Sequence, residues 1–431
     1  MRLGFTPLIG MAVWCCSGCA TTDYDWPQFR GPDGQGHSRA IGVPLRWSET
    51  ENVVWKTPIP GSGWSSPVVS GEQVWMTSAS DDGLSLRAVC VDRESGKVVH
   101  DVEVFERSDG GRKHSQNTHA SPTPVLDREH VFVHFGAEGT ACLDRDGNVI
   151  WRKTEFSYVT PHGGGASPIL HGRLLILCCD GSDKQFVVAL DKTSGDVVWK
   201  KDRLHLEDAR RKDALEKPNR RGLAFIGFAT PLVVQAAGRE QLVSVGADHM
   251  ASYDVNTGDE IWWMPFNGFS LVARPSLGNG LVYASGALRD GHFVLYAIPA
   301  DSTGKVEETD VVWQSSVGIP HVPCPLLVGT EIYGVHDGGI TTCFDALNGE
   351  TIWKERLPGN YRASPVQVGD RVYCLNRKGE MTILSTGQKF EILASNQLEG
   401  NFFASPAVAG RSLFLRSATH LYRIENSGNE S

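Results

Sequence analysis

Nine side chains of types that bind small ligands stand shortly before a recurring small-Ser/Thr-Pro segment. They are aromatic rings, imidazoles, guanidiniums and one amide, at Trp64, Asn117, His119, His162, Arg274, His321, Tyr361, Arg362 and Phe403. Aromatic rings stack on flat ligands and Arg binds carboxylate or phosphate, so these positions predict a pocket for an anionic or sugar-like ligand. Three imidazoles at such positions could also bind a transition metal. The alternative is that each His is solvated or bonded to a neighbouring carbonyl and binds nothing.

Catalytic motifs are missing from the sequence. It contains no GxSxG, no HExxH and no CxxCH haem site. The Gly-rich segment 30–36 lacks GK[ST] and is therefore interpreted as a turn rather than a phosphate loop. A hydroxyl residue recurs before Pro without a catalytic partner nearby, which favours backbone hydrogen bonding in each unit, at Ser66, Ser121, Ser167, Thr230, Ser364 and Ser405. No catalytic residue is predicted.

A repeat with an average period of about 48 residues positions these side chains. Its eight copies align on Pro67, Pro122, Pro168, Pro231, Pro275, Pro325, Pro365 and Pro406. Each unit runs from the small-Ser-Pro start through an apolar strand, a Gly turn, a second strand and a third strand that ends in Asp, to a turn and a Trp strand. The clearest turns are DKTSG, DVNTG and DALNG, in which Asp begins the turn and Gly adopts positive φ. Each unit is therefore four short strands.

The ends of the chain predict how the repeats close. The eighth unit stops near Ile424 without its Trp strand, and the segment from Asn52 to Thr57 has the Trp pattern before the first unit. That segment can complete blade eight and remove the open sheet edge. The sequence predicts an all-β fold, an eight-bladed propeller of four-stranded blades closed by the N-terminal strand.

The Trp residues are expected to act as wedges between neighbouring blades. Three units depart from the pattern. His100 replaces Trp in unit one, unit five has a longer turn from Asp301 to Asp310 before Trp313, and unit seven has lost Trp. Weaker docking of these blades is expected.

The net charge and the N-terminal sequence indicate which partners and which cell compartment to expect. The chain has 431 residues, 41 Lys plus Arg against 50 Asp plus Glu, and a net charge of −9, which argues against nucleic-acid binding. Residues 1–18 resemble an export signal of lipoprotein type, cut before Cys19, which would carry the lipid. Plain secretion with a cut after Ala20 is the alternative. We expect a monomer in the periplasm, anchored to a membrane through the lipid.

The remaining boundaries follow from composition. We expect a leader at 19–50, the propeller at 51–425 with a charged insertion at about 202–222, and a disordered tail at 426–431. The insertion is interpreted as a solvated excursion or a partner-binding loop. Seven cysteines lie beyond Cys19, and Cys90, Cys142 and Cys343 occupy one repeated slot, which predicts buried thiols rather than disulfides. Cys178 and Cys179 leave a vicinal disulfide open.

The pattern AxSPxxxxGxxY followed by LDxxTGxxxW resembles the PQQ-like, or quinoprotein, repeat over about residues 50–425. That family includes pyrroloquinoline-quinone (PQQ) dehydrogenases and BamB-like exported lipoproteins, and the segment WPQFRGPDGQGHS resembles a leader found in exported PQQ-like proteins. The resemblance implies the fold. It does not identify the activity, because the motif describes the scaffold rather than the central site.

Three functional hypotheses remain. The first is a non-catalytic binding or assembly scaffold of the cell envelope with an envelope protein as partner and no cofactor. The second is an oxidoreductase that uses PQQ and Ca²⁺ on an alcohol or sugar, although no segment resembling the family's calcium ligands or catalytic Asp is found. The third is a carbohydrate-binding propeller, which rests on the aromatic residues.

Overall fold

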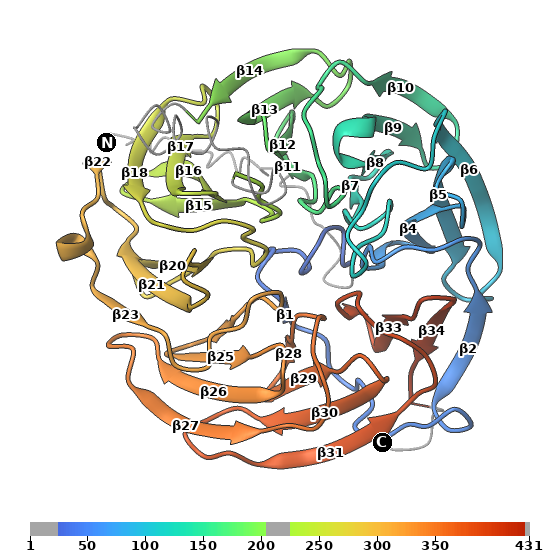
Figure 1. The fold of residues 1–431 in the computed structure, drawn as a ribbon. Helices are drawn as coiled ribbons and strands as arrows, with labels where there is room; N and C mark the ends of the chain where they lie inside the picture. The colour runs from blue at the N-terminus through green and yellow to red at the C-terminus, as the bar shows by residue number, and fades with distance from the viewer. Residues whose placement is uncertain (1–24, 204–224, 427–431) are drawn as a thin grey trace, which may run out of the picture.

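The structure, a computed structural model, describes residues 25–203 and 225–426. The predicted signal peptide, Cys19, residues 204–222 of the insertion and most of the predicted tail lie outside the described residues. Eight antiparallel sheets stand in a ring, as Figure 1 shows, and helical structure among the described residues is limited to short 3₁₀ turns such as Gly136–Glu138 and Glu308–Asp310. No helix in the described part has the length and apolar character needed to cross a membrane.

Within a blade, successive strands lie side by side from the central axis to the outer edge of the ring. Blades 1 to 4 consist of β3 (Val68–Ser70), β4 (Gln73–Ala79), β5 (Ser85–Asp92) and β6 (Val98–Glu106); β7 (Val125–Leu126), β8 (His130–His134), β9 (Thr140–Asp144) and β10 (Val149–Lys153); β11 (Ile169–His171), β12 (Leu174–Asp180), β13 (Gln185–Asp191) and β14 (Val197–Asp202); and β15 (Leu232–Ala236), β16 (Arg239–Gly246), β17 (His249–Asp254) and β18 (Glu260–Pro265).

Blades 5 to 8 continue the ring. They consist of β19 (Ser276–Gly278), β20 (Leu281–Ala287), β21 (Phe293–Pro299) and β23 (Trp313–Ser315); β24 (Leu326–Val328), β25 (Glu331–Val335), β26 (Ile340–Asp345) and β27 (Thr351–Arg356); β28 (Val366–Val368), β29 (Arg371–Leu375), β30 (Glu380–Ser385) and β31 (Ile392–Gln397); and β32 (Ala407–Ala409), β33 (Ser412–Arg416), β34 (His420–Ile424) and β2 (Val53–Pro58). The eight-bladed fold and its closure by the N-terminal strand are confirmed.

The recurring hydroxyl residues link the inner strands to one another. The backbone N–H of Ser66 donates to Thr123 Oγ1 of blade 2 at 2.9 Å, and Ser405 of blade 8 donates to Ser66 Oγ at 3.1 Å. Equivalent bonds involve the hydroxyls of Ser167, Thr230, Ser364 and Ser405. We call the six hydroxyl side chains, at Ser66, Thr123, Ser167, Thr230, Ser364 and Ser405, the hydroxyl collar.

One residue of the predicted set was wrong. Thr123, not Ser121, holds the collar position of blade 2, so the repeated proline of that unit is Pro124 rather than Pro122. The segment SPTP offers two prolines that fit the pattern, and the hydrogen bonds select the second. Ser121 instead bonds Asn117 and Thr118.

The predicted Trp wedges are present, and four of them rest on a turn glycine of the following blade. The indole Nε1 of Trp199 in blade 3 donates to Val255 O in the turn of blade 4, and a Cβ on Gly258 would lie 2.6 Å from its ring. Trp55, Trp151 and Trp313 pair with Gly96, Gly195 and Gly349 of the following blades in the same way. The DxxTG turn therefore closes its own hairpin and also contacts the Trp of the preceding blade.

The atypical units make additional or different contacts. The long turn of unit five carries β22 (Gly304–Lys305), which pairs in parallel with β18 and covers the outer edge of blade 4. At blade 7, which lacks Trp, the N-terminal segment supplies Trp47, whose ring lies parallel to Tyr373. Glu49 Oε1 accepts hydrogen bonds from Glu399 N of blade 7 and from Tyr422 OH of blade 8. In blade 1, His100 stacks on Trp75.

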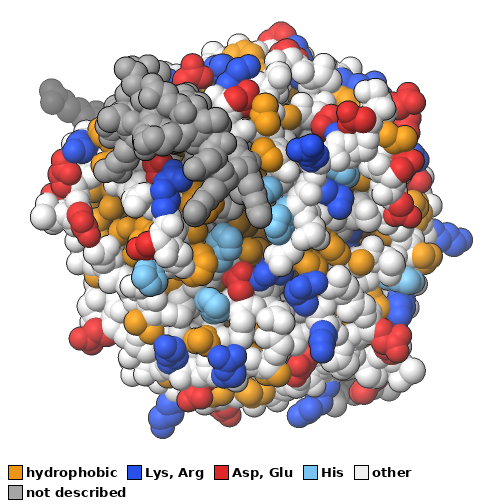
Figure 2. Space-filling view, in the orientation of Figure 1, with side chains coloured by type: hydrophobic (Ala, Val, Ile, Leu, Met, Phe, Trp, Pro, Cys, Tyr) orange, Lys and Arg blue, Asp and Glu red, His pale blue; other side chains and the backbone are white. Residues whose placement is uncertain are grey.

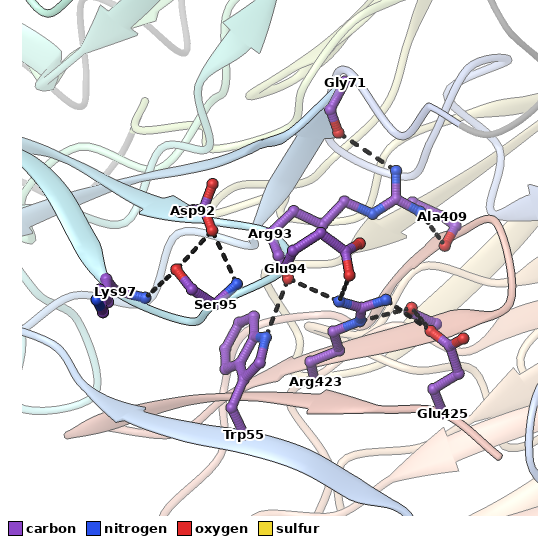
Figure 3. A network of polar contacts seen from close by, with 11 residues as sticks. Trp55, Gly71, Asp92, Arg93, Glu94, Ser95, Lys97, Ala409, Arg423 and Glu425 are labelled. Atoms are coloured by element: carbon purple, nitrogen blue, oxygen red, sulfur yellow. Dashed lines mark hydrogen bonds and ion pairs between the residues drawn. The ribbon is translucent and has the colours of Figure 1, made fainter. Parts of the chain in front are cut away.

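The joint between blades 8 and 1 carries the network drawn in Figure 3. Arg93 donates to the carbonyls of Gly71 and Ala409, while its own carbonyl accepts from Trp55 Nε1 and Arg423 Nη1. Arg423 also pairs with Glu94 and Glu425 at 2.9 Å each. The first and last described segments of the chain are therefore joined by side-chain bonds as well as by the β2–β34 ladder.

The prediction of buried thiols is confirmed. Cys90, Cys142 and Cys343 are fully buried, and all seven cysteines of the described chain are free. Burial raises the pKa of each of these three thiols to about 12. Cys178 and Cys179, at the end of β12, are buried free thiols too, so the vicinal disulfide left open by the sequence is absent.

Replacing Gly258 by Ala should test the contact between Trp and the turn glycine. Gly238 is a matched control, because its φ of +73° is close to the +74° of Gly258, whereas the space at its Cβ position is open. Both variants should lose about 1–2 kcal/mol of unfolding free energy, because Ala disfavours a left-handed backbone. Gly258→Ala should lose about 1–3 kcal/mol more from overpacking against Trp199, measured as the free energy of unfolding in urea. Equal losses would contradict the docking role.

Candidate functional site

The inner strands place alternate side chains in the central channel. Residues one and three positions before each repeated proline face the axis, because side chains of an extended segment alternate in direction. They surround a cavity of about 310 Å³, with the third position occupied by Trp64, Ser121, Gly165, Phe228, Val272, Val322, Arg362 and Phe403. In Figure 2 pale-blue histidine side chains gather around the centre of this face of the ring. We call this end of the channel the mouth.

The N-terminal segment closes the other end of the channel. Trp26 bridges to Val69 of β3, Pro27 O accepts from Leu126 N, and β1 (His37–Ser38) pairs in parallel with β28. Between these contacts the segment crosses the centre of the ring, as its blue ribbon in Figure 1 shows, and Phe29 reaches the cavity. Val69, Leu126 and β28 all lie after the repeated prolines, so the segment forms the floor beneath the hydroxyl collar. The expected leader is thus part of the site.

Two buried arginines hold this floor. Arg274 of blade 5 donates to Pro231 O at 3.0 Å and to Phe29 O at 2.8 Å, and Arg30 donates to Pro365 O and Gln35 O. Burial lowers the pKa of Arg274 to about 10 and also lowers that of Arg30, yet both stay charged at neutral pH. Their hydrogen-bond partners here are neutral carbonyls, so positive charge collects below the cavity, offset in part by Asp33.

One wall of the mouth is the loop between β6 and β7. Asn117 Nδ2 donates to His162 O at 2.8 Å and Gly164 O at 3.0 Å, and its Oδ1 accepts from Thr118 N. The amide of Asn117 is therefore engaged in holding the loop against blade 3. His114, on the same loop, accepts a hydrogen bond from Gln116 N at Nδ1, which leaves Nε2 protonated and exposed as a donor.

The opposite wall holds an ion pair. Arg362 Nη1 contacts Asp337 Oδ2 at 2.5 Å, and Arg362 Nη2 donates across the mouth to Gln116 Oε1. Asp337 Oδ1 accepts from the backbone of His321 and Val322. His321 Nε2 meets Ser270 O at 3.2 Å, so Nδ1 of the neutral ring is an acceptor, and burial lowers the pKa of this histidine.

Stacked aromatic rings line the remaining walls. The ring centroids of Trp64 and Phe403 are 4.2 Å apart at 16°, and the guanidinium of Arg377 lies over Phe403. His162 stacks on Phe228 on the far side of the mouth. These rings give the cavity a flat apolar surface.

Six of the nine predicted ligand-binding residues line this cavity, namely Trp64, Asn117, His162, His321, Arg362 and Phe403. Their role in binding stays a prediction. Three do not line it. His119 bonds Arg107, because the true register of blade 2 moves it two positions further from the collar; Arg274 turns down to the floor; and Tyr361 is fully buried, with its hydroxyl on Pro358 O. Phe29, His114 and Gln116 also line the cavity; they stand outside the repeated positions before proline, so the repeat gives no signal for them.

The described lining of the cavity includes no Asp or Glu side chain. Ca²⁺ prefers carboxylate oxygens, so the donor set does not fit the calcium ion that accompanies PQQ in the dehydrogenases. Within residues 25–203 and 225–426 no group of three His, Cys, Asp or Glu side chains is placed to hold a metal ion. The open hypothesis of a three-imidazole metal site is therefore not supported. What the cavity offers is hydrogen bonding and stacking.

Behind the mouth, buried His134 should make stability depend on pH. Its Nδ1 bonds Thr140 Oγ1 at 2.8 Å, and burial lowers its pKa from 6.5 to about 4. The unfolded chain binds this proton below pH 6.5 but the folded chain does not, so stability is lost as pH falls through that window. Between pH 7 and pH 5 the loss should be about 2 kcal/mol. The difference in the free energy of unfolding between pH 7 and pH 5, measured in urea, should be smaller in His134→Gln by that amount. An unchanged difference would contradict the role of His134.

Comparison with solved structures shows the fold these blades share with other proteins. The crystal structure of BamB from Moraxella catarrhalis matches with a TM-score of 0.58 and 15% identity, over 86% of this chain and 99% of that one. A europium-containing methanol dehydrogenase matches with a TM-score of 0.64 and 10% identity, over 92% and 90%. The computationally designed Ika8 protein matches with a TM-score of 0.55 and 10% identity, over 89% and 100%.

Sequence comparison identifies the family. No curated protein matches the chain by sequence. The family model described as outer membrane protein assembly factor BamB matches residues 45–157 and 183–430, which is most of the chain and nearly all of the propeller. The chain therefore belongs to the BamB family of PQQ-like β-propellers.

Proposed function

We propose that this protein is a non-catalytic scaffold of the cell envelope that holds a protein partner on the mouth face of its propeller. The observation that carries the proposal is the composition of the central cavity, whose described lining has no carboxylate to serve as a base or to bind Ca²⁺.

The mouth face is the side of the ring with long connections. The loop from Glu106 to Val125 lies there, whereas on the opposite face β11 and β12 are joined by a two-residue turn, Gly172 and Arg173. Long loops on a rigid scaffold are where binding surfaces develop. The family's printed name, an outer membrane protein assembly factor, supports a partner within the envelope. Export and a lipid on Cys19 would place the propeller on the periplasmic side of a membrane.

Site-specific photo-crosslinking should locate the partner. A photoreactive residue at Lys113 or Val317, both exposed on the mouth face, should give one discrete adduct in intact cells. The same residue at Arg173 or Arg239, exposed in turns of the opposite face, should not. Adducts of equal yield from both faces, or none from either, would contradict the proposal.

In the same cells Cys19→Ser should move the chain from the membrane to the soluble fraction, while Cys15→Ser should not.

Titration with PQQ tests the alternative function. The purified protein, without residues 1–18, should give no saturable heat with PQQ in calorimetry, with or without Ca²⁺. Micromolar binding that requires Ca²⁺ would contradict the non-catalytic proposal and support a quinoprotein oxidoreductase. Binding that is independent of Ca²⁺ would indicate a cavity that accepts aromatic anions without the chemistry of the dehydrogenases.

A further inference from the structure

We propose that the central cavity is a binding site for an acidic monosaccharide, a sugar ring that carries one carboxylate. This inference goes beyond the scaffold role, because it concerns a small ligand inside the channel, although the site shares the loop between β6 and β7 with the proposed partner surface. Three properties of the cavity support it: an apolar stacking surface, a surplus of groups that both donate and accept hydrogen bonds, and positive charge without a carboxylate in the described lining.

The stacking surface is the pair Trp64 and Phe403. Both rings line the cavity and stack on each other at 4.2 Å, so their orientation is fixed before a ligand arrives. The C–H face of a sugar packs on such a surface, and a ring already held in place loses little conformational entropy on binding. The cavity volume of about 310 Å³ lies at the small end of ligand pockets, which suits one sugar ring rather than a long chain.

The hydroxyl collar supplies the polar partners. Each collar oxygen accepts a backbone N–H from the neighbouring blade, as at Ser167 and Ser364, and its own hydrogen remains to donate toward the channel. At the mouth, His114 Nε2 is a donor and His321 Nδ1 is an acceptor, from the hydrogen bonds that their other nitrogens make. Sugar hydroxyls both donate and accept, so they match a set of this kind, whereas a planar aromatic acid would leave most of it unused.

Charge selects the acidic sugar over a neutral one. Arg362 is the guanidinium on the described lining, and its Nε is buried with no hydrogen-bond partner among the described residues. Asp337 neutralises Arg362 from behind, outside the lining. Arg30 and Arg274 add positive charge at the floor. Arg416 adds positive charge behind Ser65 in the wall, where it has carbonyl and hydroxyl partners and a pKa lowered to about 9 by burial. In a poorly solvated channel this field attracts an anion.

Calorimetry with three probes tests the proposal on the purified chain without its signal. D-glucuronate should bind at one site per chain, at least tenfold tighter than D-glucose, which lacks the carboxylate, and tighter than benzoate, which lacks the hydroxyls. Arg362→Gln should remove the preference for glucuronate over glucose, and Arg362→Lys should retain part of it. Trp64→Leu should weaken both sugars together. Arg239→Gln, the same charge change in an exposed hairpin, should leave all three affinities unchanged.

Each other outcome overturns the assignment. Equal affinity for glucose and glucuronate would mean that charge is not recognised, and benzoate binding as tightly as glucuronate would make the site one for aromatic acids. The absence of glucuronate binding at millimolar concentration would exclude the ligand class. Full preference in Arg362→Gln would place any anion elsewhere. Far-ultraviolet circular dichroism checks that each variant is folded, and Arg362→Lys keeps the test valid if removal of the charge opposite Asp337 unfolds the chain.

Discussion

At six of the eight joints between neighbouring inner strands, the backbone N–H of one blade donates to a side-chain hydroxyl of the next. Because this bond runs from blade 8 to blade 1 as well, it fixes the radius of the channel and the level at which every collar side chain stands. A hydroxyl does this with one lone pair and keeps its own proton, so the same residue builds the wall and lines the cavity. Arg274 takes this position in blade 5, and its long side chain serves the floor instead.

The outer edge of the ring is held by a different contact, Trp against Gly, and the N-terminal segment compensates where that contact is lost. Trp47 packs on blade 7, and the side chains of Asn396 and Glu49 exchange hydrogen bonds between that segment and the blade. The segment therefore has two structural roles: it closes the channel, and it packs on blade 7, which lacks its Trp. Weaker docking of blade 7, expected from the missing Trp, is offset by residues far away in the sequence.

Periodic features of the fold could be predicted from the sequence, and features that occur once could not. Blade number, the closing strand, the Trp wedges and the buried thiols all follow from a repeated position. The floor depends on single residues such as Phe29 and Arg30, whose partners lie in several blades and leave no local pattern. The candidate site was predicted in part for the same reason. Trp64, Arg362 and Phe403 obey the rule of three positions before proline, whereas His119 was misplaced because SPTP contains two candidate prolines.

The closing strand also constrains the order in which this chain can fold. The partner of β2 is β34, so the segment that leaves the ribosome early finds its place only after nearly the whole chain has been made. The floor has the same dependence, because β1 pairs with β28 of blade 7. Until then β2 has no strand to pair with. A chain cut short before blade 8 would lack β34 and leave β2 as an unpaired strand, open to pairing with another chain.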